Sequence, residues 1–159
     1  MPLPEGRKSL GARWVFPIKS TGLKKAHLVA QGYTQQEGID YTETFAPVVR
    51  YDSVRVLLAL SACLRLTIHQ MDVGTAFLNS KIDSEVYVRQ PPGFVNTEHP
   101  DYVWKLNGGM YSLKQAPLLW NGHINRTLQA AGLQSHDGDF GLYFRNTKEG
   151  LVLEALYVD

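Results

Sequence analysis

The chain has 159 residues, of which 44% are hydrophobic and 19% charged, with a net charge of +1 and one cysteine. This length and composition fit one globular domain and exclude a disordered chain, a collagen and a coiled coil. No apolar run reaches the roughly 18 residues of a membrane helix, no secretory signal is visible, and a lone cysteine cannot form an internal disulfide, so we expect an intracellular protein that is not secreted.

Charge is unevenly distributed along the chain. Residues 1–36 carry six basic residues and one acidic residue, whereas residues 51–104 carry four basic and six acidic residues. A basic segment of this kind can bind phosphates, and an acidic one can bind a metal ion. Ordinary solvated surface has the same pattern, and charge alone favours that simpler interpretation.

Hydrophobic periodicity predicts strands and helices in a mixed order. Strands are expected over residues 12–20, 28–33, 67–73, 85–89, 102–106, 141–145 and 151–158. Helices are expected over about 54–65, with Ser53 as N-cap, and over 116–131, with a single helical turn after Gly74. This order suggests an α+β fold with an antiparallel component. The tryptophans Trp14, Trp104 and Trp120 are expected in the core.

Two aspartates, Asp72 and Asp159, stand at the ends of predicted strands. Carboxylates brought side by side repel each other unless a divalent cation lies between them. Hard oxygen ligands suit Mg²⁺, and a pair of such ions about 3.5–4 Å apart can activate an attacking oxygen and stabilise a leaving one. By spacing alone this signal is weak, because isolated aspartates are mostly surface groups.

An ordered series of short motifs extends from about residue 4 to the last residue. They are GARWVF (11–16), KAHLVAQGYTQ (25–35), GIDY (38–41), TFAPVVR (44–50), QMDV (70–73), TAFLN (75–79), EVY (85–87), QPPGF (90–94), VWKL (103–106), LKQAP (113–117) and YVD (157–159). The series resembles the reverse transcriptase of copia-type retrotransposons. The resemblance implies an RNA-directed DNA polymerase, a nucleotidyltransferase, with a right-hand architecture.

In that architecture the whole chain, residues 1–159, is one reverse transcriptase fragment. The resemblance implies fingers over 1–53 and about 82–112, and an incomplete palm over about 54–81 and 113–159. The palm would consist of an antiparallel sheet packed on helices, and the chain ends before the thumb.

The resemblance also implies roles for individual residues. Asp72 and Asp159 match catalytic aspartates that bind two Mg²⁺ ions. The backbone of Val73, next to Asp72, is assigned to the same metal site and contacts the triphosphate. Phe77 is similar to the ring that stacks under the incoming sugar and excludes a 2′-OH. Contacts are implied with the nucleotide for Gln115, Lys24 and Lys25, and with nucleic acid for Lys114 and Arg13.

The implied partners are an RNA template, a DNA primer and deoxynucleoside triphosphates, without a membrane. Members of such a family normally form part of a longer polyprotein with integrase and ribonuclease H.

Four positions and the chain end depart from the family pattern. His27 and Leu118 replace a usual Arg, Pro17 a usual Lys and Ser112 a usual Gly, and the second aspartate of the final turn is absent. The replacement at Ser112 affects the backbone only if the glycine usual there needs a positive φ. We therefore expect the chain alone to be inactive, and favour a degenerate or truncated copy over a partial gene model. The alternatives are a non-catalytic nucleic-acid-binding remnant and an unfolded product.

Overall fold

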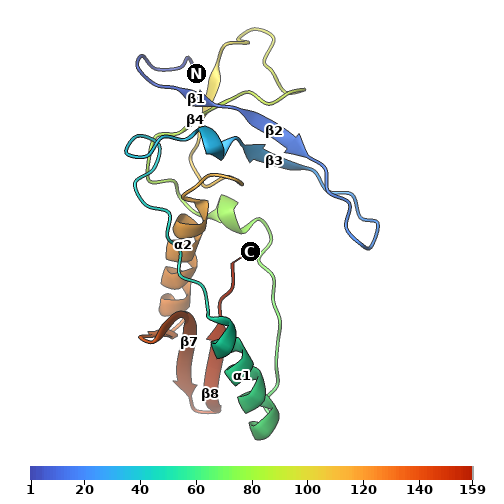
Figure 1. Cartoon of the computed structure of the whole chain (residues 1–159), viewed down its shortest axis with the longest axis vertical. Helices are drawn as coiled ribbons and strands as arrows, with labels where there is room; N and C mark the ends of the chain where they lie inside the picture. The colour runs from blue at the N-terminus through green and yellow to red at the C-terminus, as the bar shows by residue number, and fades with distance from the viewer. Residues whose placement is uncertain (159) are drawn as a thin grey trace. The chain divides into compact units, whose positions relative to one another are not determined.

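The computed structural model describes residues 1–158, which contain two α-helices, two 3₁₀ helices and eight β-strands (Figure 1). The fold is α+β, as the sequence predicts. The chain divides into two compact units, and each is described by itself. The first unit comprises Met1–Phe45 and Thr75–Trp120, and the second comprises Ala46–Gly74 and the residues from Asn121 on. The division of the chain into fingers and palm stays a prediction.

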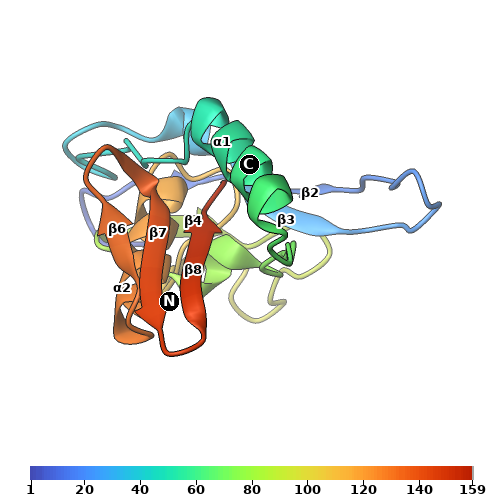
Figure 2. The same ribbon diagram turned by 90° about the horizontal axis from the view of Figure 1, so that it is seen from below.

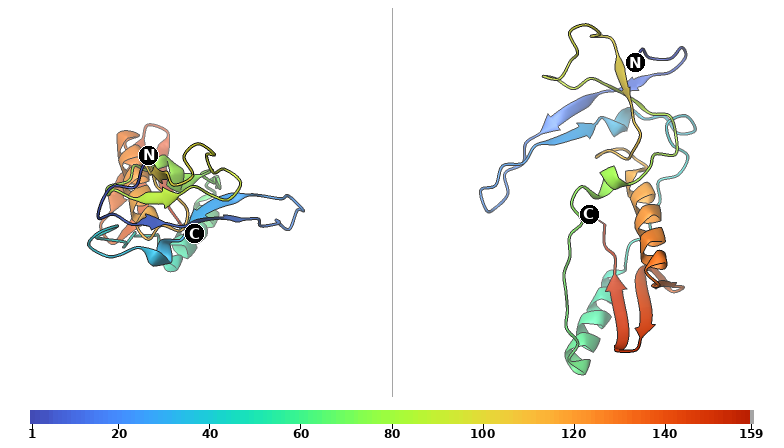
Figure 3. Two further views of the ribbon diagram at one scale, coloured as in Figure 1. Left: turned by 90° about the horizontal axis from the view of Figure 1, so that it is seen from above. Right: turned by 180° about the vertical axis from the view of Figure 1, so that it is seen from behind.

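The first unit contains two small sheets. In one, β1 (Ser9–Leu10) pairs in parallel with β4 (Tyr87–Arg89), which pairs antiparallel with β5 (Val103–Lys105). The other sheet is the antiparallel pair of β2 (Ala12–Val15) and β3 (His27–Ala30). The loop between β2 and β3 projects away from the other strands of this unit in both views of Figure 3.

Two 3₁₀ helices, η1 (Gly32–Thr34) and η2 (Ala76–Asn79), belong to the same unit. The helical turn predicted after Gly74 is η2. One apolar core joins the sheets, because alternate residues of the short strands point to the same side. Its buried members are Leu10, Ala30, Val86, Val88, Met110, Leu113 and Ala116.

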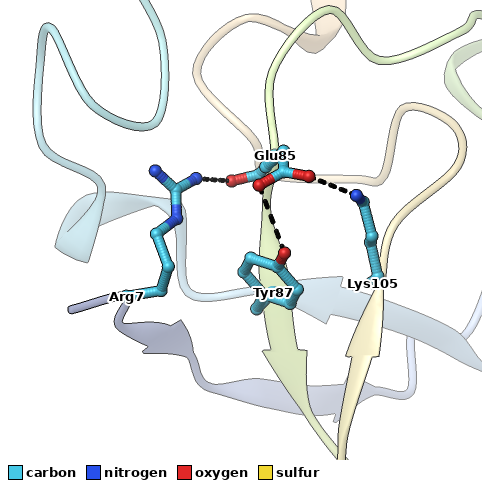
Figure 4. A network of polar contacts seen from close by, with 4 residues as sticks. All are labelled: Arg7, Glu85, Tyr87 and Lys105. Atoms are coloured by element: carbon cyan, nitrogen blue, oxygen red, sulfur yellow. Dashed lines mark hydrogen bonds and ion pairs between the residues drawn. The ribbon is translucent and has the colours of Figure 1, made fainter. Parts of the chain in front are cut away.

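A polar network on the surface ties the N-terminal arm to β4 and β5 (Figure 4). Lys105 donates a hydrogen bond to the Glu85 carboxylate, as does the Tyr87 hydroxyl, and the Arg7 guanidinium donates to the Glu85 backbone carbonyl. The Lys105 ammonium lowers the pKa of Glu85, and Glu85 in turn raises the pKa of Lys105. Because Glu85 and Lys105 are exposed, their ion pair contributes little to the stability of the fold.

The second unit contains the antiparallel sheet β6-β7-β8, whose three strands lie side by side in Figure 2. The strands are β6 (Gln134–His136), β7 (Asp139–Thr147) and β8 (Gly150–Ala155). Helix α1 (Tyr51–Leu64) belongs to this unit, and the boundary between the units falls within α2 (Ala116–Ala130). The predicted second helix and final hairpin are therefore confirmed, although β8 ends at Ala155 rather than at Val158.

A small core holds this sheet to the second half of α2. Leu128, Leu133 and Tyr143 are buried there, with Ile124 and Leu156 packed against them. Tyr143 is 1% exposed and pairs across the ladder with Glu154. Burial raises the pKa of the Tyr143 hydroxyl and of the Glu154 carboxyl.

Helix α1 is held at its N-terminus by the carboxylate of Asp139, at the start of β7. The carboxylate accepts hydrogen bonds from the Arg50 N–H at 2.9 Å, the Ser53 hydroxyl at 2.5 Å and the Gly141 N–H at 3.1 Å. Ser53 is therefore not the N-cap: the N-cap is Arg50 and the helix begins at Tyr51. The Asp139 side chain, 89 residues further along the chain, binds the free backbone N–H of Arg50.

Two other predictions from the sequence are wrong, and two predicted strands are present but shorter than expected. Residues 67–73 form no strand, and the described part of the chain offers them no ladder partner; a β-rich run becomes a strand only where another strand can pair with it. The strands predicted over 12–20 and 28–33 shorten to β2 and β3. Trp104 is 40% exposed, whereas Trp120 is 5% exposed and buried as predicted.

The helices within residues 1–158 are all too short or too polar to span a membrane.

Asp139→Ala is expected to lower the free energy of unfolding by about 1–3 kcal/mol, because the Arg50 N–H and the Ser53 hydroxyl lose their buried acceptor. Chemical denaturation monitored by circular dichroism measures the change. Asp137 is an exposed neighbour and provides the control. Asp137→Ala removes a carboxylate at an exposed position, so the free energy of unfolding should change little.

The same carboxylate should make stability depend on pH. Burial alone raises the pKa of Asp139, but the hydrogen bonds from Ser53, Arg50 and Gly141 outweigh it, so the pKa lies below its ordinary value. Its contribution is therefore present above the ordinary carboxyl pKa of about 3.9 and is lost as the pH falls through the lower folded value. The stability difference between wild type and Asp139→Asn should shrink on acidification, and a pH-independent difference would contradict this account.

Candidate active site

Asp72 and Val73 lie in the second unit, in an irregular and exposed segment between α1 and η2. Asp159, the other predicted catalytic aspartate, lies outside the described residues. Within residues 1–158 no group of three or more His, Cys, Asp or Glu side chains is placed to hold a metal ion.

The donor atoms here are oxygens of the kind that bind a hard cation, but a single carboxylate does not form a complete metal site. Mg²⁺ is bound in proteins by one or two carboxylates and keeps several water ligands. The Asp72 carboxylate and the Val73 carbonyl are oxygen donors of this kind, and the exposure of both residues leaves room for water and phosphate ligands.

Phe77 lies in the first unit, on η2, and is packed against the core of that unit. Its carbonyl accepts a hydrogen bond from the Ser80 hydroxyl at 2.7 Å. Gly109 passes so close that an added Cβ would stand 2.5 Å from the Phe77 carbonyl oxygen. Thr75, at the start of the turn, adopts a left-handed φ of 54°, which is costly for a β-branched residue. The backbone that carries the Phe77 ring is thus fixed on both sides.

Phe77 belongs to a cluster of three aromatic rings from separate parts of the chain. The Tyr111 ring packs edge-on against Phe77, with centroids 5.6 Å apart, and against His27 on β3, with centroids 5.3 Å apart. Tyr111 is not among the site residues predicted from the sequence. Its position directly before Ser112, just ahead of the LKQAP motif at 113–117, is the signal that could have identified it.

Tyr111 is held in place by a close backbone contact. Its carbonyl accepts a hydrogen bond from the Ala30 N–H at 3.0 Å. Next to this bond, a Cβ on Gly32 would lie 1.8 Å from the Ser112 carbonyl oxygen, so only glycine fits there. The contact places segment 110–112 beside β3. As a result, the Tyr111 ring lies beside His27.

Ser112 has a φ of 68°, in the left-handed region. The glycine that the resemblance implies at this position would adopt that conformation without strain, whereas a Cβ makes it unfavourable by about 1–2 kcal/mol. This departure from the family pattern therefore falls where it strains the backbone next to Tyr111.

Gln115 is fully buried, and its amide is bound within the chain. Its Oε1 accepts a hydrogen bond from Gln35 at 3.0 Å, and its Nε2 donates to the Asp40 carbonyl at 2.9 Å and to the Ser84 hydroxyl at 3.4 Å. Gln35 in turn accepts the Lys114 N–H at 2.8 Å. In this structure Gln115 organises the loops around the ring cluster, and its contact with a nucleotide stays a prediction.

The remaining predicted residues are basic and exposed. The Lys114 ammonium lies over the Tyr41 ring, 4.9 Å from its centroid, and donates a hydrogen bond to the Tyr41 hydroxyl at 3.1 Å. Arg13 lies on β2, and Lys24 and Lys25 lie in the loop that precedes β3. The first unit therefore contains Phe77, Gln115 and all four of the predicted basic residues, whereas Asp72 and Val73 belong to the second.

The pattern of the family described as reverse transcriptase (RNA-dependent DNA polymerase) matches residues 1–159. The chain belongs to the reverse transcriptase family. Two retrovirus-related Pol polyproteins are similar to this family member over 99% of its length: that of transposon RE2 from Arabidopsis thaliana and that of transposon TNT 1-94 from Nicotiana tabacum, each at 38% identity. A transposon Ty5-1 protein of Saccharomyces cerevisiae is 64% identical over 56% of the chain.

The chain spans only part of these relatives. It covers 11% of the Arabidopsis polyprotein, 12% of the tobacco polyprotein and 29% of the yeast protein. No solved structure matches the chain. The reverse transcriptase family uses divalent metal ions in general, which agrees with the oxygen donors at Asp72 and Val73.

Ser112→Gly is expected to raise the free energy of unfolding by about 0.5–1 kcal/mol, because relief of the left-handed strain exceeds the entropy lost by a glycine on folding. Thermal or chemical denaturation measures the change. Ser112→Ala is the matched control: it removes the hydroxyl but keeps the Cβ, and should leave stability near that of wild type. Equal stabilisation by Ala and Gly would show that φ is not the cause.

Proposed function

We propose that the chain supplies the nucleotide-binding surface and part of the metal-binding set of an RNA-directed DNA polymerase. The observation that carries the proposal is the ring cluster in which Tyr111 packs edge-on against both His27 and Phe77, two residues of separate matched motifs. A ring fixed in this way is a steric filter for the sugar of an incoming nucleotide. We assign the selection of the nucleotide sugar to Phe77.

The proposed reaction is nucleotidyl transfer. The 3′-OH of a DNA primer attacks the α-phosphorus of a deoxynucleoside triphosphate, the bond to the bridging oxygen breaks, and pyrophosphate leaves. Two Mg²⁺ ions, held by Asp72, the Val73 carbonyl and Asp159, would supply charge stabilisation to the attacking and leaving oxygens. Lys24 and Lys25 would offset the charge of the triphosphate, while Lys114 and Arg13 would contact the nucleic acid strands.

The wider assignments are part of the same proposal. The chain would act on an RNA template and a DNA primer, within a longer polyprotein that also carries integrase and ribonuclease H. Residues 1–53 and about 82–112 would form fingers, and about 54–81 and 113–159 would form a palm. The coverage of the Pol polyproteins supports this setting, because the chain matches only a short stretch of each.

A second candidate is non-catalytic binding of nucleic acid. It is favoured by the exposed basic residues of the β2–β3 hairpin, which need no metal site in order to attract phosphates. The two candidates differ in whether primer extension occurs.

Asp72→Asn is expected to reduce primer extension roughly hundredfold or more, because an amide cannot neutralise the charge of a divalent cation as a carboxylate does. The assay measures incorporation of dTTP on an oligo(dT)-primed poly(rA) template with Mg²⁺, using the chain in its native polypeptide. The exposed Asp101 lies outside the matched motifs, so Asp101→Asn is the control and should retain activity. Extension by Asp72→Asn at the wild-type rate would contradict the catalytic assignment.

Phe77→Val is expected to lower the preference for dTTP over rUTP by roughly tenfold or more, because a smaller side chain leaves room for a 2′-OH. The measurement is the ratio of kcat/KM for the two nucleotides on the same template. Phe77→Tyr keeps the ring and should keep the preference. Phe45→Val, at an exposed position, controls for the general loss of an aromatic side chain. Loss of activity with both nucleotides at an unchanged ratio would remove the sugar-selection role.

A further inference from the structure

Three aromatic side chains form a second cluster in the first unit, distinct from the rings around Phe77. Trp14 and Phe16 stand two residues apart in and just after β2, with ring centroids 6.3 Å apart and planes only 19° from parallel. Phe94, from the loop after β4, packs against Trp14 at 5.6 Å with its plane tilted by 48°. We call Trp14, Phe16 and Phe94 the aromatic platform.

The centre of the platform is fixed in position. The Trp14 indole Nε1–H donates a hydrogen bond to the Pro92 carbonyl at 3.1 Å, and the Trp14 backbone lies opposite Leu28 in the β2–β3 ladder. The Phe94 N–H bonds the Pro91 carbonyl at 3.0 Å, which closes a turn beside the indole. A partner that stacks on the platform would therefore find Trp14 and the Phe94 turn already ordered, and would lose little affinity to their ordering.

The outer rings are open to solvent. Phe16 is 70% exposed and Phe94 is 63% exposed. Phe16 and Phe94 each pack against Trp14 and gain little from burial in this unit. Apolar rings gathered on an exposed surface are typical of a binding site. The kind of partner that fits is then decided by the charges around the platform.

The hairpin that carries Trp14 and Phe16 has charges of one sign, whereas the loop that carries Phe94 also contains the exposed residues Glu98 and Asp101. From residue 6 to residue 36 the chain has six basic residues and no acidic one, and Arg13, Lys19, Lys24 and Lys25 on the hairpin are exposed. Exposed aromatic rings near basic side chains favour a polyanionic partner whose units have flat faces that can stack on the rings. Single-stranded nucleic acid has both features, because its bases stack on aromatic side chains while its phosphates bind cations.

We propose that the aromatic platform binds unpaired nucleic acid, with bases stacked on Phe16 and Phe94 and phosphates held by the basic residues of the β2–β3 hairpin. The strand must be unpaired, since the bases of a duplex are already stacked on each other and present only their edges. This proposal deepens the proposed function, because it rests on the nucleic-acid binding of that function and adds a contact for a single strand away from the ring cluster at Phe77.

The test is binding of fluorescein-labelled dT20 and rU20 to the full chain, measured by fluorescence anisotropy over a series of salt concentrations. A duplex of the same length is measured in parallel. We expect the chain to bind both single strands more tightly than the duplex, and the fluorescence of Trp14 to change on binding. Trp14→Phe identifies the part of the tryptophan signal that comes from this residue.

The variants separate stacking from charge. Phe16→Ala and Phe94→Ala are each expected to weaken single-strand binding roughly tenfold at an unchanged salt dependence, since base stacking carries that part of the affinity. Phe16→Tyr keeps a ring and should restore binding. Replacing Lys24 and Lys25 together by Gln should reduce the slope of log affinity against log salt by about 1.4, or about 0.7 for each phosphate that is no longer neutralised. Phe140→Ala, at a position 59% exposed in the second unit, is the control.

Three outcomes would overturn the proposal: wild-type affinity in both Phe→Ala variants, an equal loss in Phe140→Ala, or self-association of the chain that the Phe→Ala variants abolish. The last outcome would assign the platform to a second copy of the chain. Circular dichroism of each variant establishes that the fold is retained, and failure of Phe16→Tyr to bind would also count against stacking.

The test is independent of primer extension. Single-strand binding without extension would support the platform and leave polymerase activity unsupported. Extension with unchanged single-strand binding in the Phe→Ala variants would support the polymerase and remove the platform.

Discussion

The close approach of two backbone segments, at Gly32 and Ser112, organises the first unit. A Cβ on Gly32 would lie 1.8 Å from the Ser112 carbonyl oxygen, so a residue without a side chain lets segment 110–112 lie against the end of β3. The hydrogen bond from Ala30 to the Tyr111 carbonyl follows from that approach. The Tyr111 ring then reaches both His27 and Phe77, which stand 50 residues apart in the sequence.

The buried amide of Gln115 complements this contact. A buried polar group is tolerated only when its hydrogen bonds are satisfied, and Gln115 finds acceptors and a donor on Gln35, Asp40 and Ser84. Its bonds join the segment that holds Gln35 and Asp40 to the segment that holds Ser84. In the first unit, the Gln115 amide is thus bound internally, whereas the basic groups able to meet a phosphate are on the surface.

The second unit depends on a different long-range contact. Helix α1 has no fully buried residue, and Val56, Leu58 and Leu64 on it are more than half exposed, so burial of an apolar face contributes little to holding it. The Asp139 carboxylate compensates by binding the Arg50 N–H and the Ser53 hydroxyl at the helix N-terminus. One buried carboxylate therefore links the start of β7 to the start of α1.

The family, the α+β class, both helices and the final hairpin follow from the sequence alone, because motif order, apolar periodicity and turn residues are local properties. Ser112 could also be identified there as a position where a glycine conformation matters. The folded chain was needed to show that Tyr111 joins Phe77, that Gln115 is buried, that Asp139 rather than Ser53 holds α1, and that residues 67–73 stay unpaired. Each of these depends on which distant residue supplies a hydrogen-bond partner, a ring or a neighbouring strand, and local patterns carry no information on that.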